Sequence, residues 1–171
     1  QIIATIAKAQ ESDGYLDTFI QLTQPDKKWT NLFEWHELYI AGHFIEAGVA
    51  HFEATGKRTL LDVVCKLADM IERVFGLGEG QCTGAPGHEE VELALVKLAR
   101  ATGEKRYVQL AAHFINQRGV TPNYYEEEAK RLGVTNKLPV YFYHNRWAYL
   151  QAEKPVREEL EPIGHSVRAM Y

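Results

Sequence analysis

The chain has 171 residues, of which 46% are hydrophobic and 25% charged, a composition typical of one globular domain with its own core. The 19 Lys and Arg against 23 Asp and Glu give a net charge of −4, which argues against a nucleic-acid-binding protein. No run of 18 apolar residues is present to span a membrane. Two cysteines are too few for a disulfide framework, and we expect Cys65 to be a small core residue.

A helical hairpin is the first organised feature that the sequence predicts. Apolar residues from Leu38 to Phe52 recur with the i, i+3, i+7 spacing of one helix face. This pattern ends at Ala54-Thr55-Gly56, where Gly56 suits the left-handed conformation that closes many helices. A second helix is predicted over residues 60–75, and the short connection requires the two helices to be antiparallel.

The same pattern returns further along the chain. Apolar residues at 91–98 predict a helix that ends at Ala101-Thr102-Gly103, and residues 107–115 predict its partner. The two Ala-Thr-Gly turns lie 47 residues apart. A repeat of helical hairpins with such a period is typical of all-α solenoids and closed toroids, so we predict an all-α fold built of antiparallel hairpins.

Long connections separate these hairpins on the side opposite the short turns. Residues 76–87 contain five glycines, which predicts a loop that is mobile or packs closely against another segment and that lies outside the core. This loop also contains Cys82, for which nothing nearby indicates a reactive role. Residues 12–33 form another long connection, with Asp13-Gly14 as a turn.

Residues 119–161 are the least regular part of the chain. We expect a short charged helix at 124–132, with Glu126-Glu127-Glu128 on a solvated face. The aromatic stretches 140–143 and 147–150 are too short to assign. Gly164-His165 then opens another helical pattern.

Three histidines, His36, His88 and His165, each lie at the predicted start of a helix on the long-loop side. A neutral imidazole offers one hydrogen-bond donor and one acceptor, which suits sugar hydroxyls, and a helix N-terminus favours the neutral form. Helix capping is the competing interpretation of each histidine. Aromatic residues could supply apolar walls to a shared cavity or belong to an ordinary core. These residues are Tyr15, Trp29, Trp35 and the cluster at 141–149.

No pattern in this chain predicts a metal site. His36-Glu37 resembles the start of the H-E-x-x-H zinc motif, but position 40 is Ile40. His88 and Glu92 have the i, i+4 spacing of one helix face, yet two ligands are too few for zinc.

Several longer motifs carry a resemblance to a known family. They are W-H-E-L-Y from Trp35, P-G-H-x-E-x-E-L-A-L from Pro86, and K-P-V-R-E with G-H-x-V-R-A-M-Y from Lys154 to Tyr171. In this combination the sequence resembles the catalytic domain of the glycoside hydrolase family 127 β-L-arabinofuranosidases. The resemblance implies an (α/α)6 toroid, a ring of six helical hairpins, which agrees with the repeat found from the residues.

The resemblance further implies an enzyme that removes terminal β-L-arabinofuranose from plant-type glycans with retention of configuration. In that family the nucleophile is a cysteine thiolate held on Zn²⁺ by other cysteines and a glutamate, and a separate glutamate is the acid/base. Histidines that match His36, His88 and His165 contact the sugar. The cysteine cluster and the acid/base follow the G-H-x-V-R-A-M-Y element, so we expect neither a catalytic residue nor a zinc ligand in this chain.

The hairpin count indicates how the chain is organised. Residues 1–171 contain about three and a half hairpins where a toroid needs six, so we predict a single domain that is an incomplete segment of the larger barrel. The expected partners are an arabinose-containing oligosaccharide and the remainder of the polypeptide, with no nucleic acid or membrane. The compartment stays open, with the cytoplasm slightly preferred to a bacterial periplasm. The alternative is a non-catalytic helical-repeat module that binds carbohydrate or protein.

Overall fold

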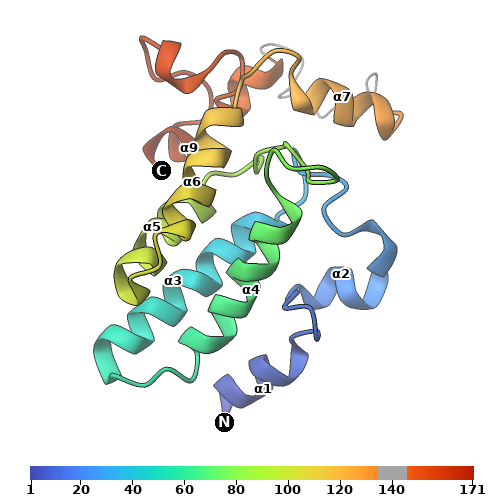
Figure 1. Ribbon diagram of the computed structural model, residues 1–171. Coiled ribbons are helices and arrows are strands. Elements are labelled where there is room, and N and C mark those ends of the chain that lie inside the picture. Colours follow the sequence, from blue (N-terminus) through green and yellow to red (C-terminus); the bar gives the residue numbers. More distant parts are fainter. Residues whose placement is uncertain (135–145) are drawn as a thin grey trace.

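A computed structural model describes residues 1–134 and 146–171 (Figure 1). The described residues form helices and loops without a strand, and no helix among them is long and apolar enough to cross a membrane. The aromatic stretch 140–143 lies outside them. The elements are α1 (Ile2–Ala9), α2 (Thr18–Thr23), η1 (Pro25–Lys27), α3 (Glu37–Thr55), α4 (Leu61–Val74), α5 (Val91–Thr102), α6 (Arg106–Gln117), α7 (Tyr124–Arg131), η2 (Arg146–Leu150), η3 (Val156–Glu158) and α9 (Ser166–Met170).

The two predicted hairpins are confirmed as α3–α4 and α5–α6. Gly56 and Gly103 adopt the left-handed conformation, with φ of 70° and 82°, and their N–H groups donate to the carbonyls of Phe52 and Ala99. Helix α3 packs against both α4 and α5, and α5 packs against α6 (Figure 1). The first helices of successive hairpins therefore lie side by side. This is the arrangement expected of a segment of an α/α toroid, so the predicted fold class is confirmed.

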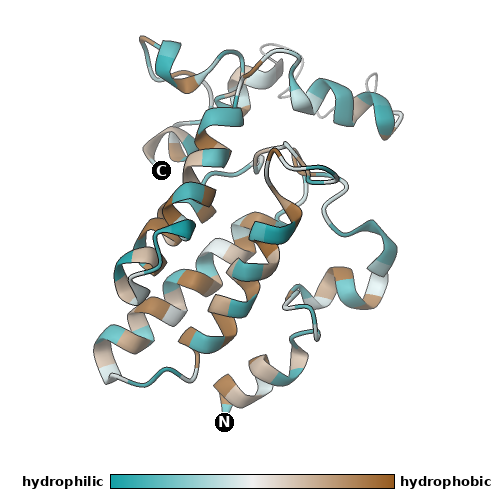
Figure 2. Ribbon diagram, in the orientation of Figure 1, coloured by the Kyte–Doolittle hydropathy of each residue, from teal (hydrophilic) through white to brown (hydrophobic). Residues whose placement is uncertain are grey.

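The core lies between these four helices. Figure 2 shows apolar and polar residues alternating along α3 and α4, as in helices with one buried face. Leu61, Val64, Leu67 and Ile71 form the buried face of α4, at a spacing of three or four residues, as the periodicity predicts. Gly48 on α3 brings the helices close together, because a Cβ atom there would lie 2.5 Å from a methyl group of Val64.

The two ends of the hairpins differ. The short Ala-Thr-Gly turns lie at one end, toward the left and lower left of Figure 1, while the 76–87 loop, the segment before α3 and the segment around η2 and α9 lie toward the other. Function in helical repeats usually resides where the long connections gather. The candidate site is therefore at the upper end of the hairpins.

Part of the glycine-rich loop is core, so the expectation that this loop lies outside the core is wrong for residues 84–87. All four of these residues are buried. A Cβ atom at Gly84 would lie 2.6 Å from Leu32, and one at Gly87 would lie 2.4 Å from the carbonyl oxygen of Phe33. The alternative that the sequence left open, close packing against another segment, is the one observed.

Two further expectations need correction. Glu128 does not lie on a solvated face: its side chain is fully buried and accepts a hydrogen bond from the Phe33 N–H at 3.0 Å. Cys65 is only half-buried.

The long connection at 12–33 contains the short helices α2 and η1, which its polar sequence did not reveal. The charged helix predicted at 124–132 is present as α7, and the helix after Gly164 is present as α9.

We expect Gly48→Val to lower the free energy of unfolding of the full-length protein by about 1–3 kcal/mol, because the added methyl groups press against Val64. Thermal or urea unfolding measures this. Val64→Ala in the same chain should recover part of the loss, and Ala54→Val, at an exposed position of α3, should cost much less. Equal stability of Gly48→Val and the parent would show that α3 and α4 are not in close contact here.

Glu128 should make stability depend on pH. Burial, the largest cause, raises the pKa of its carboxyl group from 4.5 to about 7. The folded state therefore holds a proton that the unfolded state has lost between these values, and stability falls as pH rises through that window. Glu128→Gln should remove this loss and raise the unfolding temperature at about pH 8 but not at about pH 4.5. The exposed Glu127→Gln is the matched control, and equal pH dependence of the two variants would contradict the expectation.

Candidate functional site

The three predicted histidines meet at one cavity of about 240 Å³. His36 directly precedes α3 and His165 directly precedes α9, as expected. His88 lies two residues before Glu90, the cap of α5, so it is not on a helix face with Glu92. The cavity is lined by His36, Tyr39, His88, Glu89, Tyr149, His165, Val167, Arg168 and Tyr171.

The position of His36 is fixed by buried hydrogen bonds to the following residue, Glu37. The Glu37 side chain accepts hydrogen bonds from the Tyr15 hydroxyl at 2.5 Å and from the Trp29 N–H at 3.0 Å. These contacts tie the long connection before α3 to the first turn of the helix. In the sequence, Glu37 belongs to an incomplete H-E-x-x-H zinc motif. In the structure it has a structural role instead.

His88 is positioned by contact between two backbones. The Gly87 N–H donates to the Leu32 carbonyl at 2.8 Å, and the missing side chain lets residue 87 lie directly on residues 32 and 33. The segment before His36 and the loop before His88 therefore lie side by side. The two imidazole rings end with their centroids 3.9 Å apart.

His165 is positioned in a similar way. Gly164 has a φ of 76° and lies so close to the Ala148 carbonyl that any side chain would collide with it. The Gln151 amide donates to the carbonyls of Ile163 and His165 at 2.8 and 3.1 Å. The His165 ring meets the edge of Tyr149, with centroids 5.3 Å apart.

A buried arginine connects the loop of His88 with the segment that leads to His165. The Arg118 guanidinium donates to the Pro86 carbonyl at 2.7 Å and to the Leu150 carbonyl at 2.8 Å. It also forms ion pairs with Glu89 at 2.9 Å and Glu92 at 3.2 Å. Glu92 is therefore a partner of Arg118 and not of His88.

The environment of His88 keeps its ring neutral. Burial, the largest cause, and then the nearby Arg168 lower the pKa of His88 to about 3. The same two causes, in the same order, lower the pKa of His36. The sequence predicted neutral rings from the helix N-terminus, whereas the structure gives burial and a neighbouring cation as the causes.

Arg168 also determines which nitrogen of His88 carries the proton. The Arg168 guanidinium, always a donor, lies 2.7 Å from His88 Nε2, so that nitrogen must accept. The proton of neutral His88 then resides on Nδ1. This Nδ1 atom and that of His165 are buried without a hydrogen-bond partner among the described residues.

The aromatic residues that line the cavity are not those that sequence singled out before α3. Tyr15 is core, with 1% of its surface exposed, Trp29 packs against Tyr15 and Phe75, and Trp35 lines a different cavity. Within the 141–149 cluster, Tyr149 does reach the histidines. Sequence reasoning missed Tyr39, Glu89 and Arg168 as lining residues, although all three stand inside the motifs that carried the resemblance.

The cysteines of this chain do not fit the zinc–thiolate centre that the resemblance implies. Neither lines the histidine cavity. The Cys82 sulfur lies 3.2 Å from the Tyr124 hydroxyl, and burial raises the pKa of the half-buried Cys65 thiol. No step of a mechanism is therefore assigned to either cysteine.

Comparisons with known proteins agree with these motifs. The family model described as "Beta-L-arabinofuranosidase, GH127 catalytic domain" matches residues 1–171. A non-reducing end β-L-arabinofuranosidase of Bifidobacterium longum subsp. longum is 43% identical over 97% of this chain and 26% of its own length.

Solved structures are similar as well. A GH127 β-L-arabinofuranosidase from Geobacillus stearothermophilus T6 is 48% identical with a TM-score of 0.94, over 99% of this chain and 26% of that one. Another GH127 β-arabinofuranosidase is 38% identical with a TM-score of 0.79, over 99% of this chain and 25% of its own. The chain thus spans about a quarter of the length of these relatives, and it belongs to the GH127 β-L-arabinofuranosidase family, as part of the catalytic domain.

Proposed function

We propose that this chain is the sugar-binding segment of a glycoside hydrolase that releases terminal β-L-arabinofuranose from arabinose-containing glycans. The observation that carries the proposal is the convergence of His36, His88 and His165, from three distant parts of the sequence, on one cavity. Membership of the GH127 family supports the proposed reaction and sugar, which are those that the name of the curated relative gives.

The binding role follows from the protonation states. A pentofuranose presents several hydroxyl groups, each of which can donate and accept. Arg168 contacts Nε2 of the neutral His88 ring and so fixes the tautomer with the proton on Nδ1. Such pre-arranged partners hold one sugar orientation without a costly buried charge. Tyr39 and Tyr149 add apolar walls against the sugar ring.

The chemistry itself is assigned to the remainder of the polypeptide. We propose a retaining mechanism with a cysteine nucleophile on Zn²⁺ and a separate glutamate acid/base, all outside these 171 residues. Zinc would keep that thiol deprotonated. The described residues of this chain bind and orient the sugar and exclude water from part of the site.

The alternative is a binding module without catalysis. The histidine cavity would serve that function equally well, so hydrolysis is the discriminating property. The full-length protein should release L-arabinose from an aryl β-L-arabinofuranoside. Tight binding of the same glycoside with no release would support the module.

We expect His88→Ala in the full-length protein to lower kcat/KM on that substrate by about 10- to 100-fold, since a sugar hydroxyl loses its buried partner. His36→Ala and His165→Ala should also lower it. His51→Ala, near the opposite end of α3, is the control and should leave the rate unchanged. Unchanged kcat/KM in all three site variants would remove this cavity from the reaction.

Arg168 should act through His88. Arg168→Met leaves His88 free to change its tautomer and orientation, so we expect KM to rise by about tenfold or more. Arg168→Lys retains one cationic donor and should restore part of the loss. If Arg168→Met has no effect in a His88→Ala background but a large one in the parent, the two residues act as a unit. Additive effects would show that Arg168 acts elsewhere.

A further inference from the structure

A second group of polar side chains lies along α3, beyond the histidine cavity. His36, Tyr39, His43 and Glu46 follow one another at three- and four-residue intervals, which places them on one face of the helix. His43 and Glu46 are not used by the proposed function. They face Glu90, the residue that caps α5.

The three side chains have the spacing of metal ligands. His43 Nδ1 lies 3.3 Å from Glu90 Oε1 and 4.0 Å from Glu46 Oε2, and one ligand atom from each residue falls within 4.8 Å of the others. Tetrahedral ligands at about 2.0–2.1 Å from Zn²⁺ are about 3.3–3.4 Å apart. The His43–Glu90 pair already has this separation. His43 is partly exposed, so a small rotation can bring it to Glu46.

Glu90 is the observation that points to a ligand. Its side chain is fully buried, and neither carboxylate oxygen accepts a hydrogen bond of good geometry among the described residues, although His43 Nδ1 lies 3.3 Å from Oε1. Gly42 of α3 lies against this side chain, where a Cβ atom would be 2.6 Å from the Glu90 Cγ, so the carboxylate is held in place. A buried, charged carboxylate without good hydrogen bonds is costly unless it takes up a proton or a cation compensates it.

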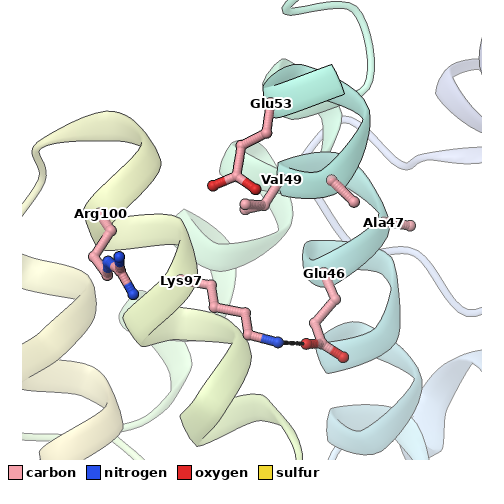
Figure 3. Close-up of a pocket in the computed structure, with 7 residues that line it drawn as sticks. Glu46, Ala47, Val49, Glu53, Lys97 and Arg100 are labelled. Atoms are coloured by element: carbon pink, nitrogen blue, oxygen red, sulfur yellow. Dashed lines mark hydrogen bonds and ion pairs between the residues drawn. The ribbon is translucent and has the colours of Figure 1, made fainter. Parts of the chain in front are cut away.

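Glu46 is oriented as a metal ligand would be. Lys97 of α5 pairs with Oε1 of Glu46, while Oε2 is the oxygen nearer to His43. Figure 3 shows the Lys97 ammonium at one oxygen of Glu46 and the other oxygen turned away from it. An outer partner of this kind fixes a ligating carboxylate without occupying the coordinating oxygen.

We propose that His43, Glu46 and Glu90 form a binding site for a divalent cation of the Zn²⁺ type, with water completing the coordination. The site contains no cysteine. It joins α3 to the cap of α5 next to the histidine cavity, since the His43 ring lies 4.5 Å from the ring of Tyr39, which lines that cavity. The bound cation would therefore fix the spacing of the two helices that His36 and His88 precede.

The competing arrangement is an ion pair without metal. Lys97 would then neutralise Glu46, and Glu90 would pair with His43 or stay neutral, because burial and then the neighbouring Glu46 raise its pKa to about 7. Both arrangements use the same residues, so a count of bound metal distinguishes them.

The test is metal content of the full-length protein after equilibration with excess Zn²⁺ and removal of free metal. The parent should retain one more Zn²⁺ per chain than Glu90→Gln or His43→Ala. Glu53→Gln, an exposed glutamate on the same helix, is the matched control and should retain as many as the parent. His43 is partly exposed, so His43→Ala should remain folded even if Glu90→Gln does not.

The position of the metal is checked directly. Crystals of the full-length protein equilibrated with Zn²⁺ should show an anomalous difference peak between the three side chains. Equal metal content in the parent and His43→Ala, or no peak at this place, would overturn the proposal in favour of the ion pair. Neither measurement depends on hydrolysis, so the result stands whether or not the proposed activity is found.

Discussion

The buried guanidinium of Arg118 joins the chain segments on which the histidine cavity depends. It holds the carbonyls of Pro86 and Leu150, from the loop before His88 and from the segment before His165, and it compensates the carboxylates of Glu89 and Glu92. A buried charge is tolerated when its donors are satisfied in this way, and loss of one partner leaves the others uncompensated. Irregular segments that lack helical hydrogen bonds thereby acquire a defined position next to regular helices.

Burial and positive charge together define the chemistry of the cavity. Neutral imidazoles are costly to protonate beside Arg168, and that arginine occupies the nitrogen that would otherwise be free to accept. The site therefore offers donors and acceptors with little mobile charge, which suits a polar, uncharged ligand such as a sugar. In the proposed enzyme, this segment would recognise the sugar, and the bond-breaking groups would belong to the remainder of the polypeptide.

Helix positions were predictable because local patterns determine them. The Ala-Thr-Gly turns, the apolar faces and the histidines at helix starts could all be found in the sequence, and Gly56 and Gly103 behave as their type requires. Contacts between residues far apart in the sequence could not be predicted in this way. Nothing local marks Glu128 as the acceptor for Phe33, which is 95 residues distant, or Arg118 as a partner of Leu150. The zinc ligands and the sugar role of the histidines rest on family resemblance and stay predictions.

The glycines that precede two of the histidines have a consequence for how such a site can change over time. Gly87 and Gly164 lie against the carbonyl oxygens of Phe33 and Ala148, so main-chain contacts, together with the Arg118 and Gln151 side chains, determine where His88 and His165 lie. Substitutions at Tyr39 or Tyr149 can therefore reshape the wall of the cavity without displacing the imidazoles. Such a scaffold keeps the positions of the imidazoles independent of the residues that shape the cavity wall.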